Sequence, residues 1–355
     1  MTKREQVLEA FQHKESDSIP AYVRIIENWE AHKEYFGIEE RDALFDKLNN
    51  TIRSFVPDYL GKQVDREYVP DDNAVTIDIG IWGIPEEYAG TYSDTVERPL
   101  SHAETLSDIE KNKWPSGSDW DFKGMNEQLR LEKNLARLSP SWMPVFSRLA
   151  ELFGMEKALT DLYLNRTLIE AALQQIDNFY TEFYENMLSS CGSNLDIFGL
   201  GDDFAGNTGL FIDPDLWRKL FKPLYAKYIG MAKDHGLHTF MHCCGKITEV
   251  LPDLIDIGLD GWQTVQTHLP GQDPEYIKKE FGKHLTFIGA IDTTNIINRE
   301  GPEVVRSHVR SQINILGRDG GYICAPDHII LSDVSSENIE ALYDECRMHK
   351  FILSE

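Results

Sequence analysis

The residues from Leu237 to Gly245 combine a short apolar strand with side chains that bind metal ions. The run ends in one histidine, two cysteines and a glycine. Because side chains alternate between the two faces of a strand, His242 and Cys244 share one face and Cys243 lies on the other. A histidine and a cysteine on one face are two of the three protein ligands of an open zinc site. The sequence therefore predicts zinc chemistry at the end of this strand.

Polar residues also follow other apolar runs of the chain, at the same point of each run. They are Asp202 and Asp203, then Gln266 and His268, then Asp292, and finally Cys324, Asp327 and His328. Single members of this set also have structural roles open to them. Asp203 can cap a turn, and Asp292 can cap the helix expected to begin near Thr294.

The third zinc ligand has two candidates at the last of these runs. His328 would complete a set with His242 and Cys244, and a mixture of Cys and His ligands favours zinc over magnesium or calcium. Cys324 competes for the same place if Ile323 faces outward toward the helices, because the cysteine then faces the interior. Zinc held this way can polarise an ether oxygen or keep a thiol ionised. The alternative is a buried histidine among inert core cysteines.

The elements that position these residues alternate short apolar runs with longer helical patterns, which is typical of a parallel sheet with crossover helices. The predicted strands lie at residues 19–25, 53–57, 142–146, 195–200, 237–242, 261–265, 285–289 and 320–324. Eight such units predict an α/β fold with a single (β/α)8 barrel, whose active site lies at the carboxyl ends of the strands. No glycine-rich nucleotide-binding motif follows any of these strands.

Helices are predicted between the strands, at residues 2–13, 122–138, 148–163, 166–191, 213–235, 246–256, 273–281, 301–317 and 335–349. The first of them is an N-terminal extension. Residues 61–120 are polar and rich in Pro, Gly and Asp, and include a predicted strand at 75–83. We interpret this stretch either as a lid-like insertion or as an irregular surface excursion, within one domain spanning residues 1–355.

The composition excludes some classes of partner. Lys and Arg number 35 against 59 Asp and Glu, which gives a net charge of −24. Nucleic acids and anionic membranes require clustered basic surface, so neither is expected as a partner. Five scattered cysteines predict a reduced, cytoplasmic protein and no disulfide framework. We find no signal-peptide pattern and no apolar run of membrane-spanning length.

Several motifs together resemble those of the uroporphyrinogen decarboxylase superfamily. They lie at residues 201–203, 221–223, 242–245, 289–292 and 320–326, and their order and spacing match from about residue 140 to 349. The resemblance implies a (β/α)8 barrel but is less specific for the reaction. One branch of the superfamily consists of cofactor-free tetrapyrrole decarboxylases, and another consists of zinc-dependent methyltransferases that work with a corrinoid.

Two departures from the family patterns bear on the choice between these branches. The decarboxylases hold propionates with an N-terminal arginine-rich motif, of which this chain has only Arg24. The methyltransferases carry His-x-Cys and a later cysteine as zinc ligands, which implies zinc on His242 and Cys244. The later cysteine is replaced by His328, so the resemblance leaves three alternatives. His328 is the third ligand, Cys324 takes its place, or the chain belongs to a third branch in which Cys244 binds no metal.

We therefore expect a zinc-dependent methyltransferase that acts between a small O-, S- or N-methyl substrate, or a thiol, and a corrinoid cofactor such as methylcobalamin on a partner protein. Asp202 and Asp203 would orient the substrate or donate a proton, and Asp292 would help to position the site without contacting the substrate. The alternatives are a metal-free decarboxylase of a tetrapyrrole or small acid, and a non-catalytic binder. Metal content separates the first two functions, and turnover with free methylcobalamin separates the first from the third.

Overall fold

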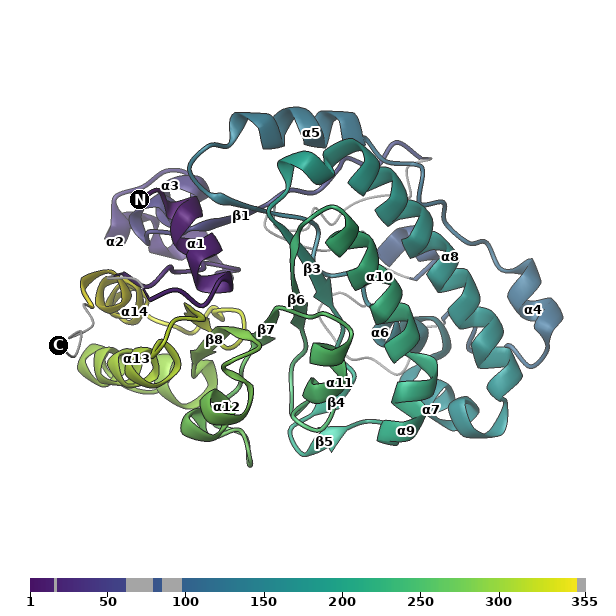
Figure 1. The fold of residues 1–355 in the computed structure, drawn as a ribbon. Helices are drawn as coiled ribbons and strands as arrows, with labels where there is room; N and C mark the ends of the chain where they lie inside the picture. Colours follow the sequence, from purple (N-terminus) through teal and green to yellow (C-terminus); the bar gives the residue numbers. More distant parts are fainter. Residues whose placement is uncertain (16–17, 62–78, 85–97, 350–355) are drawn as a thin grey trace.

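A curled parallel sheet forms the centre of the molecule (Figure 1). The computed structural model describes residues 1–15, 18–61, 79–84 and 98–349. In these ranges the main sheet has seven strands in the order β1-β2-β3-β6-β7-β8-β9, which is also their order along the chain. The strands are β1 (Ile52–Ser54), β2 (Ala136–Leu138), β3 (Ile197–Gly201), β6 (His238–His242), β7 (Gly261–Thr264), β8 (Thr286–Ile291) and β9 (Tyr322–Pro326). An α/β fold on one parallel sheet is thus confirmed.

The segment around Ala21 links the two edges of this sheet. Ala21 forms parallel bridges with Asn50, just before β1, and with Cys324 in β9. The Thr51 amide donates to the Ala21 carbonyl at 2.9 Å, and the Tyr22 amide donates to the Cys324 carbonyl at 2.9 Å. The first and last strands of the sheet therefore approach the same N-terminal segment from opposite sides.

Helices surround the sheet, and the long helix α8 runs beside α10 in Figure 1. The helices before β3 are α1 (Lys3–Phe11), η1 (Trp29–His32), α2 (Lys33–Phe36), α3 (Arg41–Lys47), η2 (Ile79–Trp82), α4 (Leu106–Lys111), α5 (Phe122–Leu131), α6 (Phe146–Phe153), α7 (Met155–Leu164), α8 (Arg166–Cys191) and η4 (Gly192–Asn194). After the hairpin β4 (Ala205–Gly206) and β5 (Gly209–Leu210) come α9 (Pro214–Leu220), α10 (Lys222–Asp234), α11 (Leu251–Asp256), α12 (Pro274–Phe281), η5 (Thr293–Ile297), α13 (Pro302–Leu316) and α14 (Ser336–Met348). None of the helices in the described ranges offers an apolar stretch that would cross a bilayer.

Helix α1 covers the amino-terminal end of the space inside the sheet. It begins with a capping box, in which Thr2 and Glu5 bond each other's backbone amides. Phe11 stacks on His238 at the start of β6, with ring centroids 4.9 Å apart. Val7 and Phe11 belong to an inner apolar cluster with residues of six strands of the sheet, such as Phe240. Since this end is filled, the carboxyl ends of the strands are where a site can form.

Some predicted elements are displaced in the structure. The third strand is β2, not residues 142–146, which form a loop over 142–145 and the first residue of α6. The predicted helix over 122–138 stops at Leu131, because the Glu132 side chain accepts bonds from the Asn134 and Leu135 amides and makes a turn. Such side-chain turns compete with the helix and leave the following residues free to pair with β1. The helices predicted over 148–163 and 213–235 are each interrupted and form α6 and α7, and α9 and α10.

The predicted insertion at residues 61–120 lies partly outside the described residues, which omit 62–78 and 85–97. The predicted strand over 75–83 falls on the first of these gaps, and its remainder forms the short helix η2. Trp82 in η2 packs on Phe179 of α8, with ring centroids 4.7 Å apart. The described part of this stretch therefore contacts the helical layer.

Candidate active site

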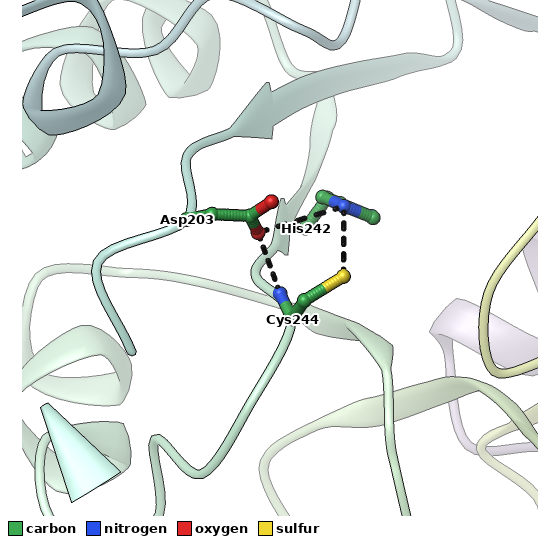
Figure 2. A group of neighbouring side chains, drawn as sticks. All are labelled: Asp203, His242 and Cys244. Carbon is green, nitrogen blue, oxygen red and sulfur yellow. Dashed lines mark hydrogen bonds and ion pairs between the residues drawn. The ribbon is translucent and has the colours of Figure 1, made fainter. Parts of the chain in front are cut away.

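Asp203, His242 and Cys244 come together at the carboxyl ends of β3 and β6 (Figure 2). The Nε2 atom of His242 lies 3.7 Å from Sγ of Cys244 and 3.9 Å from Oδ1 of Asp203. All three donor atoms lie within 4.8 Å of one another. Tetrahedral zinc, with bonds of about 2.0–2.3 Å, places its ligand atoms roughly 3.3–3.8 Å apart. The Nε2–Sγ distance lies within this range, the Nε2–Oδ1 distance is slightly longer, and the N, O and S donors suit a zinc ion.

Strand alternation decides which side chains enter this cluster. In β6, Phe240 lies in the inner apolar cluster, and His242 and Cys244 continue that face. Cys243 points the other way, into the core beneath the helices. Its burial there confirms the alternation predicted from the sequence. The same alternation separates the two residues after β3. Asp202 points toward the start of α6, and Asp203 points toward Cys244.

Asp203 is fixed to the turn that follows β6. Its Oδ1 accepts a hydrogen bond from the Cys244 amide at 2.7 Å. Gly245 completes the turn with φ +89°, and a Cβ there would lie 2.7 Å from the Gly206 carbonyl oxygen. A larger residue would push the turn away from hairpin β4–β5 and strain its backbone. The glycine after Cys244 thus allows the turn that carries His242 and Cys244 to pack closely against the hairpin.

The environment of the cluster disfavours charge in the absence of a metal ion. Burial lowers the pKa of His242 well below its usual value, and the positive charge of Arg24 adds to this. Burial also raises the pKa of the Cys244 thiol, and the nearby Asp203 raises it further. The pKa of Asp203 is raised to about 6, mainly by burial. A divalent cation would compensate for this desolvation and favour the thiolate form.

Gln263 holds the imidazole of His242 and was missed as a site residue by sequence reasoning. The parallel register of β6 and β7 pairs Gln263 with His242. Its Oε1 lies 3.2 Å from His242 Nδ1. If Nδ1 donates to this oxygen, Nε2 is left free to bind a metal. Arg24 Nη1 also lies 3.2 Å from Nδ1, so it competes with Gln263 and favours the opposite tautomer.

Neither candidate from the end of β9 joins the group around His242. His328 lies close enough to lower the pKa of His242. The third donor atom near His242 and Cys244, however, belongs to Asp203. Cys324 lies in the outer core, where it contacts Cys346 of α14. Ile323 occupies the inner cluster, the reverse of the orientation on which the Cys324 alternative depended. A change of one residue in phase moves every side chain of a strand to the other face.

Asp202 has a structural position instead of the predicted contact with substrate. Its carboxylate accepts bonds from the amides of Val145, Phe146 and Ser147, at 2.6–2.8 Å. The Tyr225 hydroxyl donates to the same carboxylate at 2.6 Å. With four donors and an exposure of 1%, Asp202 anchors the start of α6. Its acceptor sites are filled by the protein.

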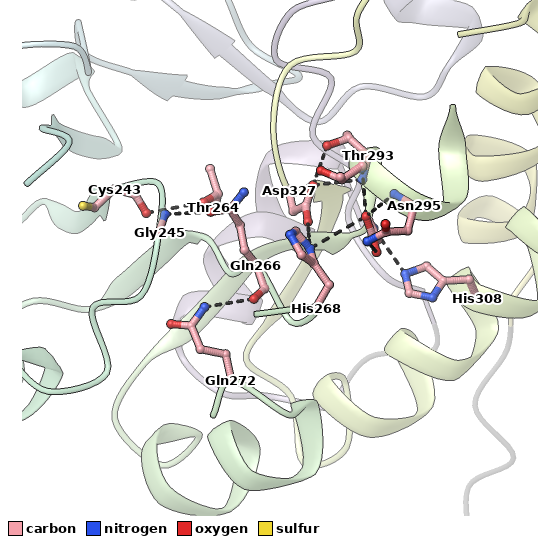
Figure 3. Close-up of polar contacts among 12 residues, drawn as sticks. Cys243, Gly245, Thr264, Gln266, His268, Gln272, Thr293, Asn295, His308 and Asp327 are labelled. Atoms are coloured by element: carbon pink, nitrogen blue, oxygen red, sulfur yellow. Dashed lines mark hydrogen bonds and ion pairs between the residues drawn. The ribbon is translucent and has the colours of Figure 1, made fainter. Parts of the chain in front are cut away.

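A second group of titratable side chains lies beside the first, at the carboxyl ends of β7, β8 and β9 (Figure 3). His268 Nδ1 lies 3.1 Å from Oδ2 of Asp327 and 3.7 Å from Oδ1 of Asp292. Asp292 caps η5 through the Thr294 and Asn295 amides, both at 2.8 Å, which is the capping role open to it from the sequence. The sequence placed these residues at strand ends but did not show that they meet.

The loop that carries His268 is tied to the turn that carries Cys244. Gln266 Oε1 accepts a hydrogen bond from the Gly245 amide at 2.6 Å. Gln272 Nε2 donates to the Gln266 carbonyl at 2.9 Å, which closes the loop (Figure 3). Asp327 also raises the pKa of the Cys244 thiol, so its charge acts on the first group. The two groups therefore form one continuous polar edge.

Comparisons with known proteins identify a family that matches this chain and a solved structure with a similar fold. The family model described as uroporphyrinogen decarboxylase (URO-D) matches residues 145–349. A methyltransferase from Methanosarcina mazei superposes with a TM-score of 0.67 at 14% identity, over 98% of this chain and 98% of that chain, which shows a shared fold. The GH18 chitinase ChiB from the chitin utilization locus of Flavobacterium johnsoniae covers 64% of this chain and 80% of its own, at 12% identity and a TM-score of 0.32 that supports no conclusion. No curated protein matches the sequence.

Proposed function

The chain belongs to the uroporphyrinogen decarboxylase family, and on this premise we propose that it is a zinc-dependent methyltransferase. The observation that carries the proposal is the convergence of Asp203, His242 and Cys244 at one edge of the sheet. A thiol beside an imidazole and a carboxylate favours zinc over harder cations. The shared fold with the Methanosarcina mazei methyltransferase, along nearly the whole of both chains, supports the choice of methyl transfer as the reaction.

The chain's own residues would prepare the donors for this metal. Gln263 accepts the Nδ1 proton of His242 and turns Nε2 toward the ion. The Cys244 amide holds the Asp203 carboxylate in place. The burial of His242 keeps competing water away from its imidazole. Zinc, when bound, supplies a Lewis acid for the heteroatom that loses or gains the methyl group.

We propose that the methyl group is exchanged with a corrinoid cofactor carried by a partner protein. The branch of the family with a His-x-Cys motif supports this choice of cofactor, and His242 and Cys244 match that motif. The bridges from Ala21 to both sides of the sheet support a complete (β/α)8 barrel, with residues 61–120 as an insertion. In such a barrel the partner would approach the carboxyl ends of the strands.

A metal-free decarboxylase is the second candidate, and the position of Arg24 favours it. The Arg24 guanidinium lies beside His242, where a substrate carboxylate would find a positive charge. In this alternative His242 keeps the tautomer that accepts from Arg24 and binds no metal. The two candidates therefore differ in whether zinc is present.

Elemental analysis of protein purified without chelators tests the proposal. We expect about one zinc per chain, in agreement with a single tetrahedral site. Cys244→Ala should lose the metal, whereas Cys243→Ser, one residue away on the opposite face, should keep it. Zinc-loaded protein should then transfer methyl groups to or from free cobalamin. Wild-type protein without zinc, or equal zinc in Cys244→Ala, would reject the proposed site.

A further inference from the structure

His268 and Asp327 form a hydrogen-bonded pair whose geometry fixes the proton on the imidazole. Oδ1 of Asp327 accepts from the Thr293 amide at 3.0 Å and from its hydroxyl at 2.7 Å. This leaves Oδ2 to accept from Nδ1 of His268 at 3.1 Å. Asp327 is fully buried, so the bond is shielded from competing water. With Nδ1 donating to the carboxylate, Nε2 is the atom that remains for a reacting group.

The charged groups around His268 favour the imidazolium form. Asp327, after β9, faces Nδ1, and Asp292, after β8, lies 3.7 Å from the same atom. On the far side of Asp292, His308 of α13 accepts a bond from the Asp292 amide at 3.2 Å. The hydrogen bond to Asp327 raises the pKa of His268, and both carboxylates add to the effect. Two buried carboxylates thus hold one proton on the ring.

The pair is adjacent to the proposed metal site. Gln266, two residues before His268, binds the Gly245 amide next to Cys244. Asp327 and His328 are consecutive, and they act electrostatically on Cys244 and His242 respectively. The side chain of His268 is 19% exposed, so the ring is reachable from the open edge of the sheet. A substrate heteroatom held by the metal would therefore lie at the same open edge of the sheet as His268.

We propose that His268 is the proton donor to an oxygen atom that loses its methyl group, which makes the substrate a methyl ether. This inference rests on the proposed methyltransferase function and selects its direction. In the reaction the C–O bond breaks and its electron pair stays on the oxygen, while the electron pair of a reduced Co(I) corrinoid forms the new bond to the methyl carbon. The Nε2 proton of His268 passes to the oxygen and gives an alcohol or phenol, and solvent restores the proton to the ring.

The chemistry of the leaving atom is the reason for choosing oxygen over sulfur. An alkoxide or phenoxide is strongly basic, so a proton supplied as the C–O bond breaks lowers the barrier. A thiol on zinc is already ionised near neutral pH and needs no such group. A protonated imidazole held by two carboxylates is the form required for donation to oxygen. A protonated imidazole would bring no advantage to a thiolate that attacks a methyl group.

Two aryl ethers with different leaving groups test this assignment. Zinc-loaded protein is mixed with reduced cob(I)alamin and either anisole or 4-nitroanisole, and formation of methylcobalamin is followed by absorbance. We expect His268→Gln to slow the reaction of anisole by about 10²-fold or more. The loss should be much smaller with 4-nitroanisole, because nitrophenoxide leaves without a proton. The same substitution at the exposed His284 is the matched control and should change neither rate.

The outcomes separate this inference from the proposed function. Equal losses for both ethers, or no loss in His268→Gln, would overturn the role of His268 as proton donor. Zinc-loaded wild type that methylates thiols from methylcobalamin and cleaves neither ether would overturn the inference and leave the methyltransferase standing. If wild type binds no zinc and cleaves neither ether, both fail. Zinc content measured in His268→Gln should equal that of wild type, because this side chain is not one of the proposed ligands Asp203, His242 and Cys244.

Discussion

The two polar groups at the edge of the sheet contain similar residues but prepare them for different chemistry. Around His242, the donor atoms of Asp203 and Cys244 stand 3.7–3.9 Å from Nε2, which leaves room for an ion between them. Around His268, the Asp327 carboxylate is 3.1 Å from the ring and is joined to it by a proton. The first arrangement suits a soft divalent cation, and the second suits a proton.

The difference arises from what else the carboxylates bind. Asp292 and Asp327 already accept bonds from backbone amides and from Thr293, so they are fixed and have little freedom to surround an ion. Asp203 accepts one amide bond through Oδ1 and is partly exposed. The comparison teaches that the same residue types, His and Asp, can be assigned to metal binding or proton transfer from their remaining hydrogen-bond partners.

The largest expected effect is on metal content and separates the two histidines. His242→Gln should lose the zinc, since the variant removes one of the three proposed ligands. His268→Gln should keep about one zinc per chain. Elemental analysis of both proteins, with circular dichroism to establish that each is folded, measures the difference. Zinc loss in both variants would mean that the two groups act as one metal centre.

A smaller effect is expected from the support of His242. Gln263→Leu removes the acceptor for Nδ1 and leaves Arg24 as the neighbour of that atom. We expect zinc affinity to fall by about 10–100-fold, as for other groups that orient metal-binding histidines. Competition with a chromophoric chelator measures the affinity. Gln174→Leu, on the exposed face of α8, is the matched control. An unchanged affinity in Gln263→Leu would show that Arg24 does not compete for the imidazole.

The proton in the second group should respond to Asp327. Asp327→Asn removes the main cause of the raised pKa of His268, so we expect that pKa to fall toward its ordinary value. NMR titration of the histidine rings measures it. Because the pKa is raised in the folded state, the pair stabilises the protein below the unfolded pKa of histidine, and this contribution is lost as the pH rises through the folded value. The destabilisation by Asp327→Asn, measured by urea unfolding, should therefore shrink at alkaline pH.

The smallest effect is expected at Cys324. Its side chain packs in the outer core with Cys346, away from both groups. Cys324→Ala should leave zinc content unchanged and should lower the free energy of unfolding by about 1 kcal/mol, the typical cost of a single substitution. Thermal unfolding and elemental analysis measure the two quantities. A protein without zinc would restore Cys324 as a ligand and contradict the orientation of β9.

Local patterns in the sequence were enough to predict part of the candidate site. The alternation of side chains along β6 put His242 and Cys244 on one face and Cys243 on the other, because this period depends only on the backbone of a strand. The same alternation left the orientation of β9 open, since it gives the period but not the phase, and the structure excludes the orientation on which the Cys324 alternative depended. Choosing the phase of Cys324 requires knowing which neighbours Ile323 packs against, and these lie in distant strands.

The sequence by itself determined the alternation of strands and helices, the polar residues at the strand ends and the His-x-Cys-Gly motif, which depend on periodicity and residue type. The tertiary structure alone decided that Asp203, and not His328, belongs to the group of donor atoms around His242 and Cys244, and that Asp327 holds His268. It also decided that β2 replaces the predicted third strand. These outcomes depend on strand register and on the curvature of the sheet, which bring together residues far apart in the chain, and no local pattern encodes those distances.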